Sequence, residues 1–283
     1  MSSRWTGSHK GKARWMGPDF LTVDVEDWPQ STVDPKSPIS PRAFLNTHRL
    51  LDLLAEHRVK ATFFVQSLVA EMFPSLVERI AWEGHEVASH GHSHIPLFNL
   101  TPDGLAADLL RSREILSHLI PQPVDGYRAP DFSVRQDTLW ALEVLRDCGF
   151  RYSSSIFPFR GRRYGLEDRP PYPHPILRGL TEVPLSVFPL GGRHWPVAGG
   201  GYLRLYPYWI TRWAMNRVHS LGRPVVVYLH PYELDPEEVT GFRGKIPFAL
   251  YWSQSLNRKH TEAKLRRLLE EFRFIPIREG IDL

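Results

Sequence analysis

The sequence predicts an α/β fold in which helices cover parallel strands, arranged either as a barrel or as a doubly wound sheet. Two observations predict it. Short runs rich in valine, phenylalanine and tyrosine alternate with longer segments of helical periodicity. Four clusters of polar residues also follow directly after four of the apolar runs. Because chemistry in α/β folds collects at the carboxyl ends of the strands, these clusters are expected to meet at one edge of the sheet.

Each strand is expected from a short apolar run bounded by turn residues. The expected strands span residues 20–25, 61–65, 86–89, 126–128, 152–155, 182–185 and 225–229. A loop rich in proline and arginine is expected over residues 157–178.

Helices are expected where apolar residues recur with helical spacing between capping signals. They span residues 41–58, 74–83, 102–119, 136–148, 207–221 and 261–272. Ser40 and Thr101 are expected N-caps because a proline follows each of them at the first helical position. Gly84 and Gly149 can adopt the left-handed conformation that ends a helix.

Bulk properties restrict the class of protein. The chain has 283 residues, 42% apolar and 23% charged, which suits a soluble globular domain. Cys148 is the only cysteine, so no internal disulfide can form. The net charge of +4 is spread along the chain, which argues against a nucleic-acid surface.

The ends of the chain and its apolar stretches give an expectation about location. Residues 1–18 are expected to form a basic flexible tail, and residues 19–283 one domain that includes a C-terminal extension. No apolar stretch is long enough to span a bilayer, and no signal peptide precedes the domain. We therefore expect a cytoplasmic protein, with peripheral membrane contact left open. The sequence gives no indication of oligomeric state.

The segment from Ser89 to His94 contains three alternate histidines directly after an expected strand. His90 and His94 are four residues apart, so one helical turn or a tight loop can direct both imidazoles at a single ion. His92 is expected to face away from them. The pattern predicts a metal site at this strand end.

Asp24, Glu26 and Asp27 place three carboxylates at the end of another apolar strand. Burying carboxylates without a counter-charge is costly, so they should meet a cation or face solvent. One carboxylate with two histidines makes a metal site that leaves positions open for water and substrate. A second carboxylate could then act as a general base.

Two further side chains belong to the same edge. Arg128 has a planar guanidinium that can orient a catalytic carboxylate. His230 follows the strand at 225–229, where a general acid is needed to protonate an amine leaving group. The glycines 199–201 lack the residues of a phosphate-binding loop, so they are interpreted as a turning loop at the site.

These segments resemble the motifs of the polysaccharide deacetylases of the NodB-homology kind, carbohydrate esterase family four. The matching segments are Phe20–Asp24, Ser89–His94, Tyr127–Phe132 and Tyr228–Pro231. The second half, with Gly199–Arg204, His230–Asp235 and Thr261–Arg266, is similar to the subgroup encoded with exopolysaccharide loci of the PEP-CTERM type.

The resemblance implies a distorted (β/α) barrel of about seven parallel strands. It also implies a divalent ion, most often Zn²⁺, and hydrolysis of an N-acetylated sugar to release acetate. By resemblance, Asp24 is the catalytic base, Arg128 positions it, and His230 is the catalytic acid. His90 and His94 bind the metal. The predicted substrate-binding residues are Phe132, Trp195, Gly200 and Tyr202, with a backbone N–H near Asp131 or Phe132 holding the oxyanion.

The sequence departs from the family pattern in two places. Two adjacent aspartates normally supply the base and a metal ligand, whereas here Val25 follows Asp24. Strand alternation favours Glu26 as the ligand, and a sharp turn would favour Asp27. The acidic partner of His230 is also open among Glu182, Glu233 and Asp235.

Two alternative functions remain at this point. The same fold could hydrolyse a cyclic amide or imide, such as a ureide, without the usual metal. A chain with a decayed site could instead serve as a sugar-binding module.

Overall fold

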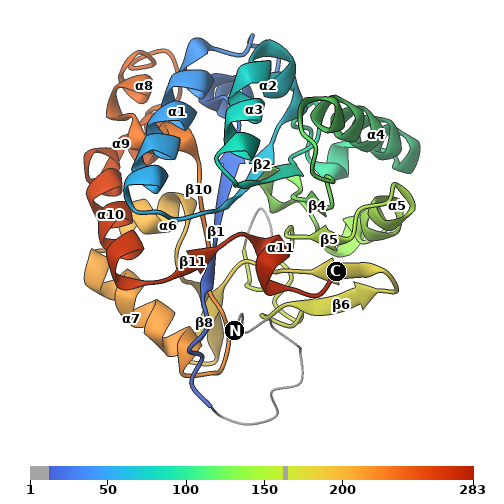
Figure 1. Ribbon diagram of the computed structural model, residues 1–283. Coiled ribbons are helices and arrows are strands. Elements are labelled where there is room, and N and C mark those ends of the chain that lie inside the picture. The colour runs from blue at the N-terminus through green and yellow to red at the C-terminus, as the bar shows by residue number, and fades with distance from the viewer. Residues whose placement is uncertain (1–12, 162–164) are drawn as a thin grey trace.

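The computed structural model describes residues 13–161 and 165–283. Its centre is a curved sheet in which seven parallel strands follow one another in the order β10, β1, β2, β3, β4, β5 and β7 (Figure 1). They are β1 (Asp19–Val25), β2 (Thr62–Val65), β3 (Glu86–Ser89), β4 (Gly126–Tyr127), β5 (Tyr152–Ser153), β7 (Leu180–Glu182) and β10 (Val226–Leu229). The predicted barrel of about seven parallel strands is confirmed.

The barrel is distorted between β7 and β10. Across the described ranges these two strands do not pair with each other. The chain between them lines the gap instead: the Val226 N–H donates to Ser186 Oγ at 2.7 Å, and Gly199 forms a parallel bridge with Tyr228. The short edge strands are β6 (His174–Leu177), antiparallel to β7, and β11 (Phe274–Ile275), parallel to the start of β1. A separate hairpin consists of β8 (Val187–Leu190) and β9 (Arg193–Pro196).

Alternation along β1 separates the core from the barrel interior. Leu21, Val23 and Val25 belong to the large apolar cluster under the helices, whereas Phe20 belongs to a smaller cluster on the opposite face. Because side chains alternate along a strand, Thr22 and Asp24 also face the interior. The same alternation on the other strands gives the barrel an interior of mixed polar and aromatic side chains.

Helices surround the outside of the sheet, as Figure 1 shows. They are α1 (Pro41–Glu56), α2 (Ser67–Met72), α3 (Pro74–Trp82), α4 (Pro102–Leu119), α5 (Ala141–Asp147), α6 (Gly200–Leu205), α7 (Tyr208–His219), α8 (Pro236–Thr240), α9 (Phe248–Ser255), α10 (Thr261–Glu271) and α11 (Ile277–Gly280). Thr101 caps α4 as predicted, accepting from the Gly104 N–H at 3.1 Å. Ser40 stands at the N-cap of α1, but its hydroxyl donates to Asp27 rather than to its own helix.

Several predicted elements differ in the structure. The helix expected over residues 136–148 is a single 3₁₀ turn, Gln136–Thr138, followed by α5. Here the Thr138 hydroxyl accepts from the Arg135 N–H and donates to the Ser133 carbonyl, so it stabilises a turn instead of a continuous helix. The strand expected at 182–185 lies earlier, at Leu180–Glu182, and the loop expected over 157–178 contains β6.

Most of the predicted N-terminal tail, residues 1–12, lies outside the described residues. Within residues 13–18, Trp15 is buried and its backbone N–H donates to the His219 carbonyl at 2.8 Å. Among the helices within 13–161 and 165–283, none combines the length and the apolar composition needed to cross a bilayer.

Candidate active site

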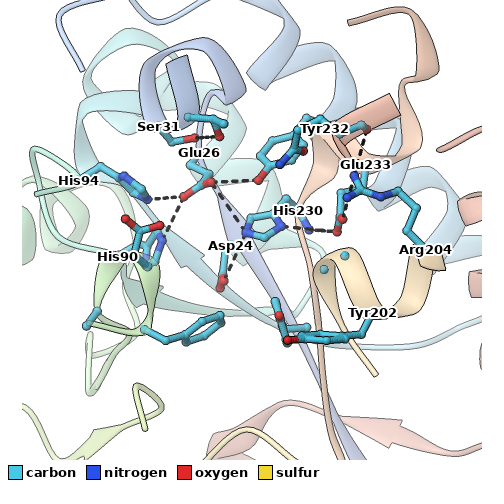
Figure 2. Close-up of a pocket in the computed structure, with 18 of the residues that line it drawn as sticks. Asp24, Glu26, Ser31, His90, His94, Tyr202, Arg204, His230, Tyr232 and Glu233 are labelled. Atoms are coloured by element: carbon cyan, nitrogen blue, oxygen red, sulfur yellow. Dashed lines mark hydrogen bonds and ion pairs between the residues drawn. The ribbon is translucent and has the colours of Figure 1, made fainter. Parts of the chain in front are cut away.

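The site lies at the carboxyl ends of the parallel strands, where Asp24 and Glu26 continue the interior face of β1. Figure 2 shows Glu26 at the centre, with His90 and His94 on one side and Tyr232 and His230 on the other. Glu26 is only 5% exposed. Burial favours its protonated form, but the charges of His94 and His230 and its hydrogen bonds to the histidines hold its pKa well below the usual value.

Glu26, His90 and His94 offer three ligand atoms within 4.8 Å of one another, and all three residues are buried. Glu26 Oε2 lies 3.2 Å from His90 Nε2 and also contacts His94 Nε2. The His90 Nδ1–H donates to the Arg128 carbonyl at 2.9 Å, which leaves Nε2 as the ring nitrogen that faces Glu26. The predicted convergence of His90 and His94 is present.

The loop after β3 brings the two histidines together. Asp108 on α4 accepts from the backbone N–H groups of His92 and Ser93, at 2.8 and 3.0 Å. Gly91 has φ +75°, and a Cβ there would lie 2.9 Å from the Asp108 carboxylate. The His92 ring bonds Ser67 instead of joining the other two histidines. His92 therefore faces away, as the sequence predicts.

Asp27 does not join the histidines. Its carboxylate accepts from the Ser40 hydroxyl at the start of α1, and burial raises its pKa against the opposing effect of Ser40. Of the two carboxylates that the sequence left open as metal ligands, the structure brings Glu26 to the histidines. Strand alternation continues one residue past β1, and the turn begins after Glu26.

Asp24 lies beside Glu26 and pairs with Arg128. The Arg128 Nη1 donates to Asp24 Oδ1 at 2.7 Å and to Thr22 Oγ1 at 2.9 Å. The rest of the guanidinium donates to the carbonyl and hydroxyl of Ser154, and it stacks 4.1 Å from the centre of the Phe64 ring. With four of its five N–H groups engaged, Arg128 holds Asp24 in one orientation.

His230 stands opposite the two histidines. Its Nε2 lies 3.8 Å from Asp24 Oδ2 and 3.7 Å from Glu26 Oε1, and its Nδ1 lies 3.4 Å from Glu233 Oε2. Burial lowers the pKa of His230, but the bond to Glu233 and the charges of Glu26, Glu233 and Asp24 outweigh it and raise the pKa to about 9. His230 is therefore charged at neutral pH in this arrangement.

Glu233 is the acidic residue that contacts His230 among the three candidates from the sequence. Glu182 accepts instead from the backbone N–H groups of Ser155 and Ile156, and Asp235 pairs with Arg42. The spacing in the sequence is a local signal for this pairing, because Glu233 is three residues after His230 in a 3₁₀ turn. Its carboxylate also accepts from the backbone N–H of His230.

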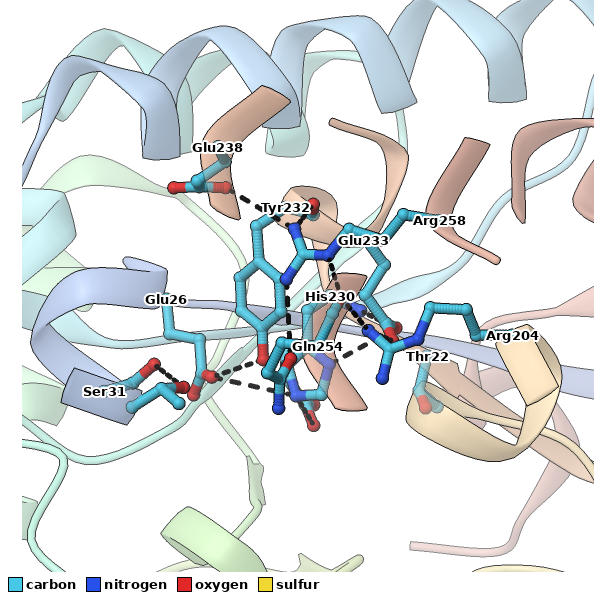
Figure 3. A network of polar contacts seen from close by, with 12 residues as sticks. Thr22, Glu26, Ser31, Arg204, His230, Tyr232, Glu233, Glu238, Gln254 and Arg258 are labelled. Atoms are coloured by element: carbon cyan, nitrogen blue, oxygen red, sulfur yellow. Dashed lines mark hydrogen bonds and ion pairs between the residues drawn. The ribbon is translucent and has the colours of Figure 1, made fainter. Parts of the chain in front are cut away.

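Two buried arginines from distant parts of the chain support this turn, and sequence reasoning missed both. Figure 3 shows Arg204, from α6, beside Glu233 and Arg258 beside Tyr232. Arg204 Nη1 lies 3.8 Å from Glu233 Oε1, and Arg258 Nη1 donates to the Tyr232 carbonyl at 2.5 Å. The Tyr232 hydroxyl in turn donates to Glu26 Oε1 at 3.2 Å. Through these contacts, Arg204, Arg258 and Tyr232 connect the second half of the chain to Glu26.

Asp24, Glu26, His90, His94 and His230 line one cavity of about 570 Å³. Phe132, Gly200 and Tyr202 line it as well, as predicted. Trp195 does not line it: it lies on β9, in a different hollow of the surface. The Phe132 N–H donates to the Ala129 carbonyl at 3.1 Å, so of the two expected oxyanion donors the N–H of Asp131, which also lines the cavity, stays a prediction. Phe132 faces the cavity with its ring.

The polysaccharide deacetylase family matches residues 40–153, and a family described as a domain of unknown function, DUF3473, matches residues 154–282. The first match contains His90, His94 and Arg128. Asp24 and Glu26 precede it, and His230 lies within the second.

Relatives with assigned activities match about a third of the chain. A peptidoglycan-N-acetylglucosamine deacetylase of Bacillus cereus is 38% identical over 98 residues, covering 34% of this chain and 36% of that protein. A chitooligosaccharide deacetylase of Sinorhizobium fredii is 52% identical over 100 residues, covering 35% of this chain and 44% of that protein. The chain thus spans less than half the length of these relatives.

The fold extends the similarity to the second half. A crystal structure from Mycobacterium smegmatis, provisionally assigned to the polysaccharide deacetylases, superposes with a TM-score of 0.61 at 22% identity. The superposition covers 92% of this chain and 86% of that one, so it shows a shared fold across both matched regions. The match over residues 40–153 places that part of the chain in the polysaccharide deacetylase family, and the superposition adds the shared fold alone.

Proposed function

We propose that this chain is a metal-dependent hydrolase that removes the acetyl group from an N-acetylated sugar and releases acetate. The observation that carries the proposal is that Glu26 joins His90 and His94 on one side and lies 3.7 Å from His230 on the other, where His230 also lies 3.8 Å from Asp24. A ligand set, a carboxylate held by an arginine and a charged imidazole thus face a single cavity.

Glu26, His90 and His94 would hold the ion. One carboxylate oxygen and two imidazole nitrogens form a donor set that suits zinc, cobalt or nickel, and three protein ligands leave positions open. The hydrogen bond from His90 Nδ1 to the Arg128 carbonyl fixes the tautomer that a ligand histidine needs. A divalent ion in such a site supplies Lewis acidity and lowers the pKa of water.

Asp24 and His230 would carry the two proton transfers. Asp24, oriented by Arg128, accepts the proton of the attacking water, and its second oxygen faces His230 at 3.8 Å. His230 donates its Nε2 proton to the nitrogen that leaves, because an amine is a poor leaving group until it is protonated. Glu233 stabilises the charged form of His230 through Nδ1.

The substrate class follows from the relatives and from the cavity wall. The relatives are named for peptidoglycan N-acetylglucosamine and for chitooligosaccharides, which share an acetamido sugar. Tyr202 lines the cavity next to the glycines at the start of α6 and offers a ring face against which a sugar can stack. We include the precursor of an exopolysaccharide in this class.

The test is acetate release by the wild type and by Asp24→Asn, each loaded with zinc, from chitooligosaccharides and peptidoglycan fragments. The wild type is expected to release acetate and the variant to retain metal but lose nearly all turnover. A wild type that binds one equivalent of zinc yet releases acetate from no acetylated sugar would contradict the proposal. Activity on a cyclic ureide that resists chelation would favour a cyclic amide hydrolase instead.

A further inference from the structure

A second hollow, of about 410 Å³, lies on the surface among β8, β9 and α7. Its lining side chains are apolar or aromatic and include Leu190, Trp195, Tyr206, Trp209 and Trp213, which we call the aromatic groove. Phe188 packs edge-on against Trp213, with the ring centroids 5.1 Å apart, so a ring contact orders the base of the groove.

The groove is exposed to an extent that folding alone does not explain. Trp209 is 69% exposed, Leu190 54%, Trp213 45% and Trp195 43%. A single exposed apolar side chain is ordinary, but several large ones around one hollow mark an interaction surface. None of the four lines the cavity that contains Asp24 and Glu26, so the proposed hydrolysis leaves them without a role.

The stretch of chain that forms the groove carries charged side chains of one sign. From Val183 to Tyr232 the sequence contains five arginines and no aspartate or glutamate. Arg193, Arg212 and Arg217 of this run are exposed. Arg212 pairs with Glu271 of α10 at 2.6 Å, a surface pair that compensates one of the three charges. An apolar hollow edged by arginine fits a partner that is both apolar and anionic.

We propose that the aromatic groove docks the protein onto an anionic lipid bilayer. Tryptophan and tyrosine prefer the level of the lipid headgroups, where the ring is partly buried and its N–H or O–H meets water. Arginines beside them attract anionic lipids and strengthen the binding of an apolar surface. A second copy of this chain fits less well, because self-association through the groove would bring like charges together.

The groove lies next to the proposed active site. Leu205, the last residue of α6, lines the catalytic cavity, and the following residue, Tyr206, lines the groove. Figure 1 shows α6 and α7 on the same side of the barrel. A bilayer bound at the groove would therefore lie beside the cavity. The proposal is independent of the chemistry, because it concerns binding alone.

The test is sedimentation of the full chain with vesicles of phosphatidylcholine alone and of phosphatidylcholine mixed with phosphatidylglycerol. Binding to the mixed vesicles is expected, with a loss at high salt. The triple variant Trp195→Ala, Trp209→Ala, Trp213→Ala is expected to bind at least ~10-fold more weakly. Trp82→Ala is the matched control, because Trp82 is 86% exposed on α3, away from the groove. Arg193→Gln and Arg217→Gln are each expected to weaken binding about fivefold.

Trp209→Ser, a single change at the most exposed of the three indoles, keeps the test valid if the triple variant fails to fold. Circular dichroism and thermal unfolding identify variants that fold like the wild type. The proposal is overturned if the wild type ignores both kinds of vesicle, or if folded groove variants bind as strongly as Trp82→Ala. It is also overturned if sedimentation velocity shows a dimer that the groove variants dissociate while vesicle binding is unaffected.

Discussion

Arg128 and Asp24, 104 residues apart in the sequence, form a buried ion pair in which Nη1 lies 2.7 Å from Oδ1. Breaking such a pair from one side leaves an unpaired buried charge, which costs several kcal/mol. The pair is therefore both a structural link between β1 and β4 and the feature that fixes the orientation of the candidate base.

Asp24→Asn should separate binding from turnover. The amide keeps the size of the side chain but cannot accept the proton of water, so kcat is expected to fall by about 10²–10⁴-fold. Zinc affinity, measured by titration calorimetry, should stay near that of the wild type, because Asp24 is outside the ligand set. A variant that loses both together would show that Asp24 acts as a ligand.

Glu26→Gln and Asp27→Asn form a matched pair that identifies the third ligand. Glu26→Gln replaces the carboxylate that faces His90 and His94 with a neutral amide. Zinc affinity is therefore expected to fall by more than about 100-fold, a larger loss than removing a hydrogen-bond partner of a metal ligand causes. Asp27→Asn removes a partner of Ser40 and should leave zinc binding unchanged. Equal losses in the two variants would refute this assignment.

Glu233→Gln should shift the pH dependence of turnover. Removing the negative charge beside Nδ1 lowers the pKa of His230 from its raised value, so the acid form is lost at a lower pH. The basic limb of the kcat profile is expected to move to lower pH. Asp235→Asn is the control, because Asp235 pairs with Arg42, and its profile should match that of the wild type. An unshifted limb in Glu233→Gln would exclude His230 as the group that titrates there.

Gly199→Ala should destabilise the fold at the start of α6. Gly199 has φ +140°, and an added Cβ would lie 2.1 Å from the Tyr228 ring. Crowding of this kind costs about 1–3 kcal/mol, to be measured by urea unfolding. Gly191→Ala has a positive φ of +62° but open space around its Cβ, so it should cost less. If Gly199→Ala proved as stable as Gly191→Ala, the result would show that the Tyr228 ring can move aside.

The sequence was most informative where local pattern decides the structure. Alternation on β1 placed Glu26 on the side of Asp24 but left Asp27 open through a sharp turn, whereas the position of His90, His94 and His230 after apolar strands predicted one shared edge. These inferences need only the strand period and the rule that parallel strands end together. They required no knowledge of tertiary contacts.

What the sequence did not predict depends on contacts between distant residues. Arg204 and Arg258 reach the turn of Tyr232 and Glu233 only through the packing of α6 and of the segment after α9. The similarity of Gly199–Arg204 to the exopolysaccharide subgroup gave Arg204 no role. The helix α9 buries no residue completely, so it lacks the apolar stripe that marks a helix in a sequence. Trp195 was predicted to bind substrate, but it lies on the hairpin of β8 and β9 and lines the aromatic groove instead.

The central claim is that Glu26, His90 and His94 hold a divalent ion on which acetate release depends. The most direct measurement is acetate release from a chitooligosaccharide by the chelated protein during titration with zinc. We expect no release before zinc is added and full activity at one equivalent. Full activity in the metal-free protein, unchanged by added zinc, would contradict the account.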